Sequence, residues 1–155
     1  MKRRLAITLL ALTFATPALA CSTLPDLPAV QAALIRDINV QRRANGLSTL
    51  TASAPLTRTA QSLACDNAAR RAVVHTGSNG STLKTRLAAQ GYRYSTAAEN
   101  AAGGYPDPAS VTDGWMHSPD HRHNILTAPL REIGVGVAKG SDGLLYWIID
   151  LGAPR

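Results

Sequence analysis

The sequence has little charge, few aromatic side chains and few cysteines. Of its 155 residues, 17% are charged and 5% are aromatic, and only two are cysteine. Proteins that coat phosphates or stack single-stranded bases combine a dense cationic stripe with aromatic platforms. The composition therefore predicts no nucleic-acid partner. The length and the 45% hydrophobic content indicate one globular domain.

The first 20 residues contain the main apolar run. Three cations, Lys2, Arg3 and Arg4, precede an apolar stretch, and Ala18-Leu19-Ala20 has the small-x-small pattern of a signal cleavage site. Removing this segment leaves thirteen cations against ten acidic residues, a net charge of +3 in place of +6. We therefore predict a signal peptide at 1–20, one domain at 21–155 and a secreted or periplasmic protein. No later apolar run approaches the ~18 residues of a transmembrane helix.

The two cysteines allow two interpretations. In an exported protein, Cys21 and Cys65 are most simply a disulfide. The alternative is a lipid on Cys21, which would be the first residue after cleavage. Lipoprotein signals usually carry Leu three residues before that cysteine, and here the position holds Ala18. The sequence favours the disulfide and leaves lipid anchoring open.

The apolar periodicity predicts helices followed by a hairpin. Helices are expected over about 27–45 and 53–72, with shorter ones after Ser81 and over 107–116, the last ended by Ser118-Pro119. The segment 98–102 fits either helix or strand. Two apolar runs, 133–137 and 144–149, flank an Asp-Gly loop and predict an antiparallel hairpin. This pattern indicates an α+β domain whose helices cover a sheet.

The four histidines are the main candidates for chemistry, because imidazole is the commonest metal ligand and carries protons near neutral pH. His117 and His121 have the spacing of a zinc protease helix, but Pro119 lies between them and no glutamate follows His117. We reject that motif and predict that His117 and His123 are exposed. No nucleophile elbow, phosphate loop or dinucleotide fingerprint is present. Spacing alone therefore assigns no reaction.

Five segments in a fixed order carry a resemblance that no single motif carries. They are 75–81 (HTGSNGS), 98–103 (AENAAG), 115–126 (WMHSPDHRHNIL), 132–137 (EIGVGV) and 146–147 (YW). Together they resemble the bacterial branch of the CAP superfamily, the SCP-like extracellular domains related to cysteine-rich secretory proteins, antigen 5 and pathogenesis-related 1 proteins. The match covers about residues 30–152.

The resemblance implies a three-layer α-β-α sandwich with a small antiparallel sheet and a central cleft. Carried over by position, the cleft residues are His75, Glu99 and His121, which in several relatives hold a divalent cation such as Zn²⁺. The fourth family ligand, an acid after the tryptophan, has no counterpart after Trp115. Two imidazoles and one carboxylate still suffice for a three-ligand Zn²⁺ site with an open position. The alternative is a polar cluster in which Glu99 accepts hydrogen bonds and only holds the fold together.

The remaining conspicuous side chains have structural interpretations. Trp115, Tyr146 and Trp147 are expected in the core, and Glu132 is expected to be a solvated loop carboxylate. Several arginines on two predicted helices are expected on solvated helix faces. In the alternative interpretation, these faces contact an anionic envelope surface. The residues are Arg36, Arg42, Arg43, Arg70 and Arg71.

We carry three functional hypotheses. The first is a monomeric, non-enzymatic binding module that acts at the cell envelope or outside the cell on a lipid, an envelope fragment or another protein. The second is a metal-dependent hydrolase, peptidase-like, with His75 and His121 as ligands and Glu99 as ligand or general base. The third is an exported structural domain in which these residues only hold the fold together.

Overall fold

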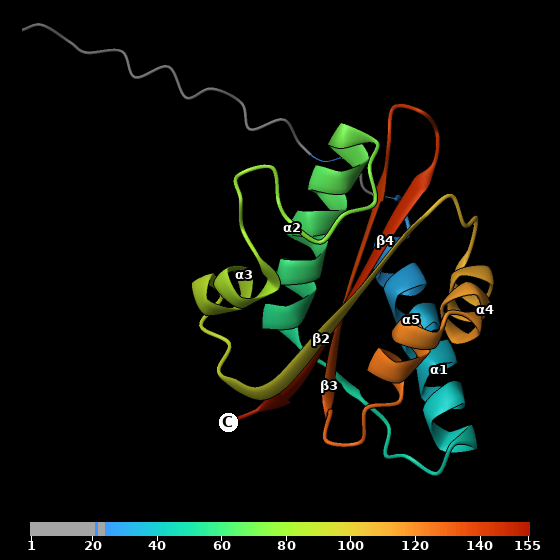
Figure 1. Cartoon of the computed structure of the whole chain (residues 1–155). Helices are drawn as coiled ribbons and strands as arrows, with labels where there is room; N and C mark the ends of the chain where they lie inside the picture. The colour runs from blue at the N-terminus through green and yellow to red at the C-terminus, as the bar shows by residue number, and fades with distance from the viewer. Residues whose placement is uncertain (1–20, 22–23) are drawn as a thin grey trace, which may run out of the picture.

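The computed structural model describes residue 21 and residues 24–155; the predicted signal peptide lies outside the described residues. A four-stranded sheet in the order β1-β3-β4-β2 lies between two helical layers (Figure 1). Helices α1 (Leu27–Ala44), α4 (Pro108–His117) and α5 (Pro119–Ile125) cover one face, and α2 (Ala54–Arg70) and α3 (Leu83–Ala89) lie on the other side. The predicted α-β-α sandwich is confirmed.

The predicted hairpin forms the centre of the sheet. Strand β3 (Glu132–Lys139) pairs antiparallel with β4 (Leu145–Pro154), and β4 pairs antiparallel with β2 (Tyr94–Gly103). The ambiguous segment 98–102 is therefore strand. Strand β1 (Thr51–Ala52) adds to β3 in parallel, so the sheet is mixed. Two residues are too short a stretch to give the alternating pattern by which a strand is recognised from sequence.

Bulky side chains fill the space between the sheet and the α1, α4 and α5 layer. Trp115 of α4 and Trp147 of β4 are 1% and 0% exposed, and they join one apolar cluster with Leu34 and Ile38 of α1. The Trp147 indole N–H donates to the carbonyl of Tyr105 at 2.9 Å. These two tryptophans, and Tyr146 on the other face, are buried as predicted.

On the opposite face, α2 packs almost directly on the backbone of β3. A Cβ added at Gly134 would lie 2.0 Å from the carbonyl carbon of Leu56, and one at Gly136 would lie 2.3 Å from that of Ala60. Glycine is therefore required at both strand positions by close approach. The alanines Ala60, Ala64 and Ala68 of α2 are fully or almost fully buried at this interface.

The short helices begin where their first residues cap them. Asp107 accepts from the backbone N–H of Ser110, and Thr82, rather than the predicted Ser81, caps α3 through Thr85. Ser118 ends α4 as predicted, but α5 begins at once, because proline is accommodated in the first turn of a helix. The sequence analysis did not anticipate this second helix, which carries His121.

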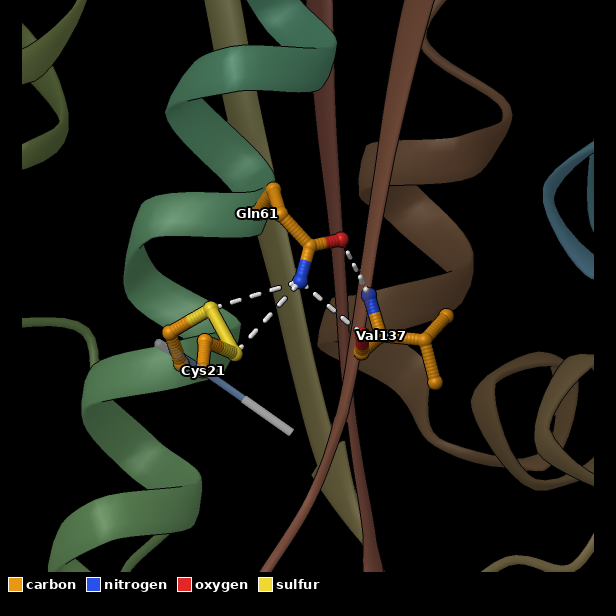
Figure 2. The surroundings of a disulfide bond; sticks show 4 residues. Cys21, Gln61 and Val137 are labelled. Carbon is orange, nitrogen blue, oxygen red and sulfur yellow. Dashed lines mark hydrogen bonds between the residues drawn. A yellow bond between two sulfur atoms is a disulfide. The ribbon is translucent and has the colours of Figure 1, made fainter. Parts of the chain in front are cut away.

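The predicted disulfide between Cys21 and Cys65 is present, with a Cα–Cα distance of 5.4 Å. It joins the start of the described chain to α2 (Figure 2). Beside it, the Gln61 amide donates to the Val137 carbonyl at 2.9 Å and accepts from the Val137 N–H at 3.1 Å. The bridge occupies the thiol that a lipid anchor would need. Among the described helices, none combines the length and apolarity needed to cross a bilayer.

Arg42 corrects one prediction for the first helix. It is 0% exposed, not solvated. Its guanidinium donates to backbone carbonyls alone, including Ser48 at 2.8 Å and Ile125 at 2.7 Å, with Thr127 and Leu130 farther away. It thereby ties the end of α1 to the end of α5, while its neighbour Arg43 is exposed as predicted.

Candidate functional site

Glu99 lies at the centre of the candidate site. It stands in β2, directly opposite Asp150 of β4, and Asp150 in turn lies opposite Gly134 of β3. Directly paired residues project to the same face of a sheet, so both carboxyl groups point toward the α2 and α3 side. The Glu99 side chain is only 4% exposed, and a buried carboxylate requires partners.

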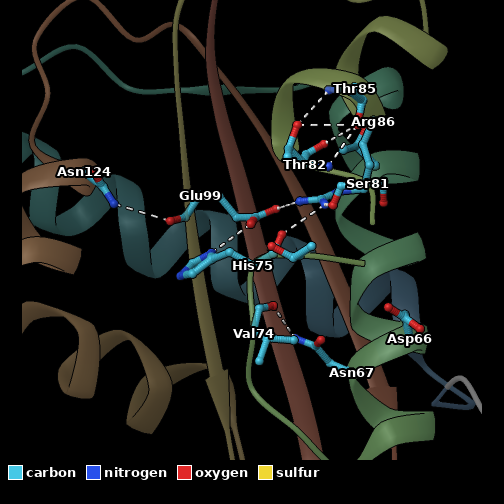
Figure 3. Close-up of polar contacts among 12 residues, drawn as sticks. Asp66, Asn67, Val74, His75, Ser81, Thr82, Thr85, Arg86, Glu99 and Asn124 are labelled. Carbon is cyan, nitrogen blue, oxygen red and sulfur yellow. Dashed lines mark hydrogen bonds and ion pairs between the residues drawn. The ribbon is translucent and has the colours of Figure 1, made fainter. Parts of the chain in front are cut away.

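Two side chains supply those partners (Figure 3). His75 Nδ1 lies 2.8 Å from Glu99 Oε1, and Arg86 Nη2 of α3 lies 2.6 Å from Glu99 Oε2. Both carboxylate oxygens are therefore engaged. The His75 side chain is 58% exposed, whereas that of Arg86 is 8% exposed.

Arg86 also fixes the loop that carries His75. Its Nη1 donates to the carbonyls of His75 at 3.1 Å and of Ser81 at 2.9 Å. The Asn67 amide of α2 donates to the Val74 carbonyl at 3.0 Å (Figure 3). The loop after α2 is thus held at both ends, which positions the imidazole beside β2 although no regular structure surrounds it.

The contacts set the charge of the pair. Burial by itself raises the pKa of Glu99, but the hydrogen bond with His75 and the nearby Asp150 and Arg86 hold that pKa below its usual value. The hydrogen bond to Glu99 raises the pKa of His75, against the opposing effect of burial. An ionised Glu99 faces an imidazole that gains protons more readily than a free one.

Asp150 is a site residue that the sequence analysis missed. It is 0% exposed, and neither carboxyl oxygen makes a hydrogen bond of ordinary geometry to any described residue. Burial, and then the charge of Glu99, raise its pKa well above the usual value. Burial thus favours the protonated form of Asp150, whereas the contacts with His75 and Arg86 favour the ionised form of Glu99. Its signal was an acid directly after the apolar Ile148-Ile149 of a predicted strand.

His121 approaches the site from α5. The Asn100 amide of β2 donates to the His121 carbonyl at 3.0 Å, and the Asn124 amide donates to the Glu99 carbonyl at 3.3 Å and to Asn100 Oδ1 at 2.9 Å. Burial, and then the charge of nearby His75, lower the pKa of His121. The two histidines thus influence each other although they flank β2 from different layers.

The three predicted ligands do not form a ready first coordination shell. Among the described residues, no group of three or more His, Cys, Asp or Glu side chains is arranged to hold a metal ion. Glu99 has both oxygens paired, one of them with a cation. What remains available is the second nitrogen of His75 and the half-buried imidazole of His121. A carboxylate on the first nitrogen of a histidine is the usual outer-shell partner of a metal ligand.

The other flagged residues lie elsewhere. His117 and His123 are exposed, as predicted, and line a hollow of about 430 Å³ between α4 and α5. Glu132 is not a solvated loop residue: it begins β3, and one of its carboxylate oxygens is buried without a partner among the described residues. Burial, and then the neighbouring Glu132 carboxylate, raise the pKa of Tyr92.

A family model described as the cysteine-rich secretory protein family, CAP, matches residues 35–151. The chain belongs to the CAP family. It is 33% identical over 104 residues to the uncharacterized protein YkwD of Bacillus subtilis strain 168, a match that covers 66% of this chain and 40% of YkwD. The CAP chain thus spans less than half the length of this curated relative.

Solved structures give the same fold. An outer surface protein of Borrelia burgdorferi has a TM-score of 0.71 at 22% identity, covering 80% of this chain and 92% of that one. An extracellular protein containing an SCP domain from Bacillus anthracis has a TM-score of 0.70 at 22% identity, covering 82% of this chain and 43% of that one. At this identity the likeness establishes the architecture alone.

Proposed function

We propose that this CAP domain is an exported, non-enzymatic binding module that contacts its ligand through the site formed by His75, Glu99 and His121. The observation that carries the proposal is the His75–Glu99–Arg86 arrangement. A half-exposed imidazole is held in one orientation by a carboxylate that is itself locked by a guanidinium. Such a group is prepared to contact a ligand, because little side-chain freedom remains to be lost.

The same arrangement speaks against the hydrolase hypothesis. A general base must reach a proton of the reacting group or of its water. The Glu99 side chain is 4% exposed and has both oxygens engaged, which leaves it poorly placed for that task. We therefore propose binding without turnover and derive no reaction step.

Export is part of the proposal. It is supported by the Cys21–Cys65 bridge, since disulfides persist in oxidising compartments, and by the extracellular and outer-surface relatives. A molecule with this bridge carries no lipid on Cys21. We accordingly propose a secreted or periplasmic monomer, and mass measurement of the mature protein tests the cleavage site, the bridge and the absence of lipid together.

We extend the proposal to a divalent cation, Zn²⁺ in the first instance. His75 and His121 would be its ligands, and Glu99 would orient His75 from behind rather than bind the ion. Two protein ligands, in place of the three or four of established zinc sites, make weak binding the expected result. If bound, the cation would supply a Lewis-acidic point for an anionic or carbonyl group of the ligand.

Two measurements test these statements. Calorimetric titration of Zn²⁺ into chelator-treated protein should give binding that disappears in the His75→Ala/His121→Ala double variant and persists in the exposed control His117→Ala/His123→Ala. Equal affinity in wild type and the first variant removes the cation site. For the binding role, wild type and His75→Ala are compared by cosedimentation with purified cell-wall sacculi and with anionic lipid vesicles. Turnover of a peptide or ester library that is lost in Glu99→Gln would overturn the non-enzymatic assignment.

A further inference from the structure

A polar groove is lined by Arg86 but not by Glu99. Two hollows, of about 200 and 330 Å³, share four lining residues: Ser62, Asn79, Ser81 and Arg86. The two hollows therefore adjoin each other between α2, the loop 77–81 and α3, and together they are called the groove. We propose that this groove binds the ring of a neutral sugar, a cyclic polyol, at a place separate from the His75–Glu99–His121 site.

One wall of the groove is a polar stripe on α2. Thr59, Ser62 and Asp66 follow each other at three- and four-residue spacing and therefore lie on one side of the helix. The loop is tied down onto this stripe, because the backbone N–H of Ser78 donates to Asp66 Oδ2 at 2.7 Å. Arg70 donates to the same oxygen at 2.8 Å. These bonds shape the groove and leave Asp66 Oδ1 as an acceptor.

The groove offers donors and acceptors in mixed order. Burial alone raises the pKa of Asp66, but its bonds to Ser78 and Arg70 hold it below the usual value, so Asp66 is an ionised acceptor. Asn79 uses its oxygen to accept from the Ser81 N–H at 3.0 Å, which leaves its amide N–H groups as donors. A hydroxyl both donates and accepts, and so matches this set.

An anion fits the groove poorly. Four backbone N–H groups of the loop already have acceptors: Gly77 donates to Ser81, Ser78 to Asp66, Gly80 to Gly77 and Ser81 to Asn79. The Arg86 charge is balanced by Glu99, and the Asp66 carboxylate stands in the opposite wall. Among the lining residues, the one cation, Arg86, and the one carboxylate, Asp66, offset each other, which gives a phosphate, sulfate or carboxylate little net attraction. Each hollow, at about 200 and 330 Å³, lies below or near the lower end of the ~300–1,000 Å³ of pockets for drug-sized ligands, a size that suits a single sugar ring.

Arg86 joins the groove to the candidate site. Its Nη1 holds the groove loop through the Ser81 carbonyl and its Nη2 holds Glu99, at 2.9 and 2.6 Å. A sugar bound in the groove therefore contacts Arg86, the side chain that holds both Glu99 and the backbone carbonyl of His75 in place. The groove remains a site of its own, since none of its lining residues is His75, Glu99 or His121.

The test uses saturation-transfer NMR with a panel of neutral monosaccharides: glucose, galactose, mannose and N-acetylglucosamine. The sugars are used at millimolar concentrations, so that binding as weak as a Kd of ~1 mM is detected. Wild type should transfer saturation to at least one pyranose and not to cyclohexanol, which lacks neighbouring hydroxyls. If saturation is transferred to none of the pyranoses, the proposal is overturned. Displacement of the sugar by sulfate overturns it in favour of an anion site.

Matched variants locate the signal. Ser62→Tyr fills the groove from an exposed helix position and should raise Kd about tenfold or more, whereas Ala32→Tyr at an exposed position of α1, in the opposite helical layer, should not. Asn79→Asp keeps the acceptor for Ser81 but removes the amide donor, and should also weaken binding. Sugar binding unchanged in Ser62→Tyr refutes the location. The His75→Ala/His121→Ala variant should retain the sugar, so failure of the cation site and failure of the groove are separate results.

Discussion

Helices α1, α4 and α5 rest on one face of the sheet through large side chains, whereas α2 rests on the other face through glycine and alanine. Trp115, Trp147 and Leu34 fill the first interface. In the second, Gly134 and Gly136 let the α2 backbone lie against β3. Core side chains can adjust their packing to small changes, but backbone in direct contact cannot. The loop that carries His75 comes directly after α2, the helix on this less adjustable face.

The difference explains where the polar residues gather. On the α2 side, the row Gly134, Asp150 and Glu99 runs across three strands. The small residue at the β3 end brings the helix close, and the two acids fill the rest of the row beneath α2 and α3. The bulky face has no such row among the described residues, and its charged side chain, Arg42, is satisfied by carbonyls at helix ends. The close packing of α2 on this face of the sheet thus holds the residues of the candidate site in place.

The largest expected effect comes from the bridge on the α2 side. Reducing Cys21–Cys65, which are 44 positions apart, releases a long loop in the unfolded chain and should lower the free energy of unfolding by about 4 kcal/mol. Urea unfolding with and without reductant measures it. The Cys21→Ala/Cys65→Ala variant should match the reduced protein. Coincident unfolding curves for the oxidised and reduced forms would show that the N-terminal tether adds no stability.

The next effect separates close packing from backbone strain. Gly134→Ala places a methyl group 2.0 Å from the backbone of Leu56 and should cost about 3 kcal/mol of stability, the upper range of overpacking. The control Gly80→Ala sits in open space at φ +78 and should cost about 1 kcal/mol from the left-handed backbone alone. Equal losses in urea unfolding would mean that α2 shifts freely, and the contrast between the two faces would disappear.

The bulky face is tested through its buried cation. Arg42→Met leaves the carbonyls of Ser48 and Ile125 without their donor and should cost about 2 kcal/mol. Arg42→Lys should not restore stability, because an ammonium lacks the planar fork that reaches several carbonyls. The neighbouring exposed Arg43→Met should change stability by less than about 0.5 kcal/mol. A loss in Arg43→Met as large as that in Arg42→Met would contradict the burial argument.

Much of this architecture follows from local sequence. Helical periodicity located α1 and α2, and the Asp-Gly loop located the β3–β4 hairpin. Strand β1 and helix α5 were not predicted from the sequence. Two residues are too few to show a periodic pattern, and a proline after a helix is typical of both a helix end and a helix start. The burial of Arg42 was not predicted for a different reason. A cation on a helix is solvated by default, and only the tertiary arrangement of carbonyls 83 to 88 positions away buries it.

The candidate site was predictable in part. The resemblance pointed to His75 and Glu99, whose side chains lie 2.8 Å apart, and the metal role of the set with His121 stays a prediction. Asp150 and Arg86 were missed because their importance depends on strand register and on the placement of α3. Neither spacing nor composition shows that β2 and β4 pair with Glu99 opposite Asp150.

The smallest effect distinguishes the two facing carboxyls by the sign of their pH dependence. The raised pKa of Asp150 favours its protonated form in the folded protein. In the unfolded chain, the same carboxyl group ionises above its ordinary pKa of 3.8. Its contribution to stability is therefore complete below that pH and is lost as pH rises toward the folded pKa. Asp150→Asn cannot ionise, so its stability relative to wild type should improve steadily from about pH 4 upward.

Glu99→Gln should show the opposite pH dependence. The pKa of Glu99 is lowered in the fold, so its carboxylate stabilises the folded protein above the ordinary pKa of 4.5. This contribution is lost as the pH falls through the folded pKa. Urea unfolding across pH measures both slopes. If Asp150→Asn tracks wild type at every pH, the proton of the pair does not reside on Asp150.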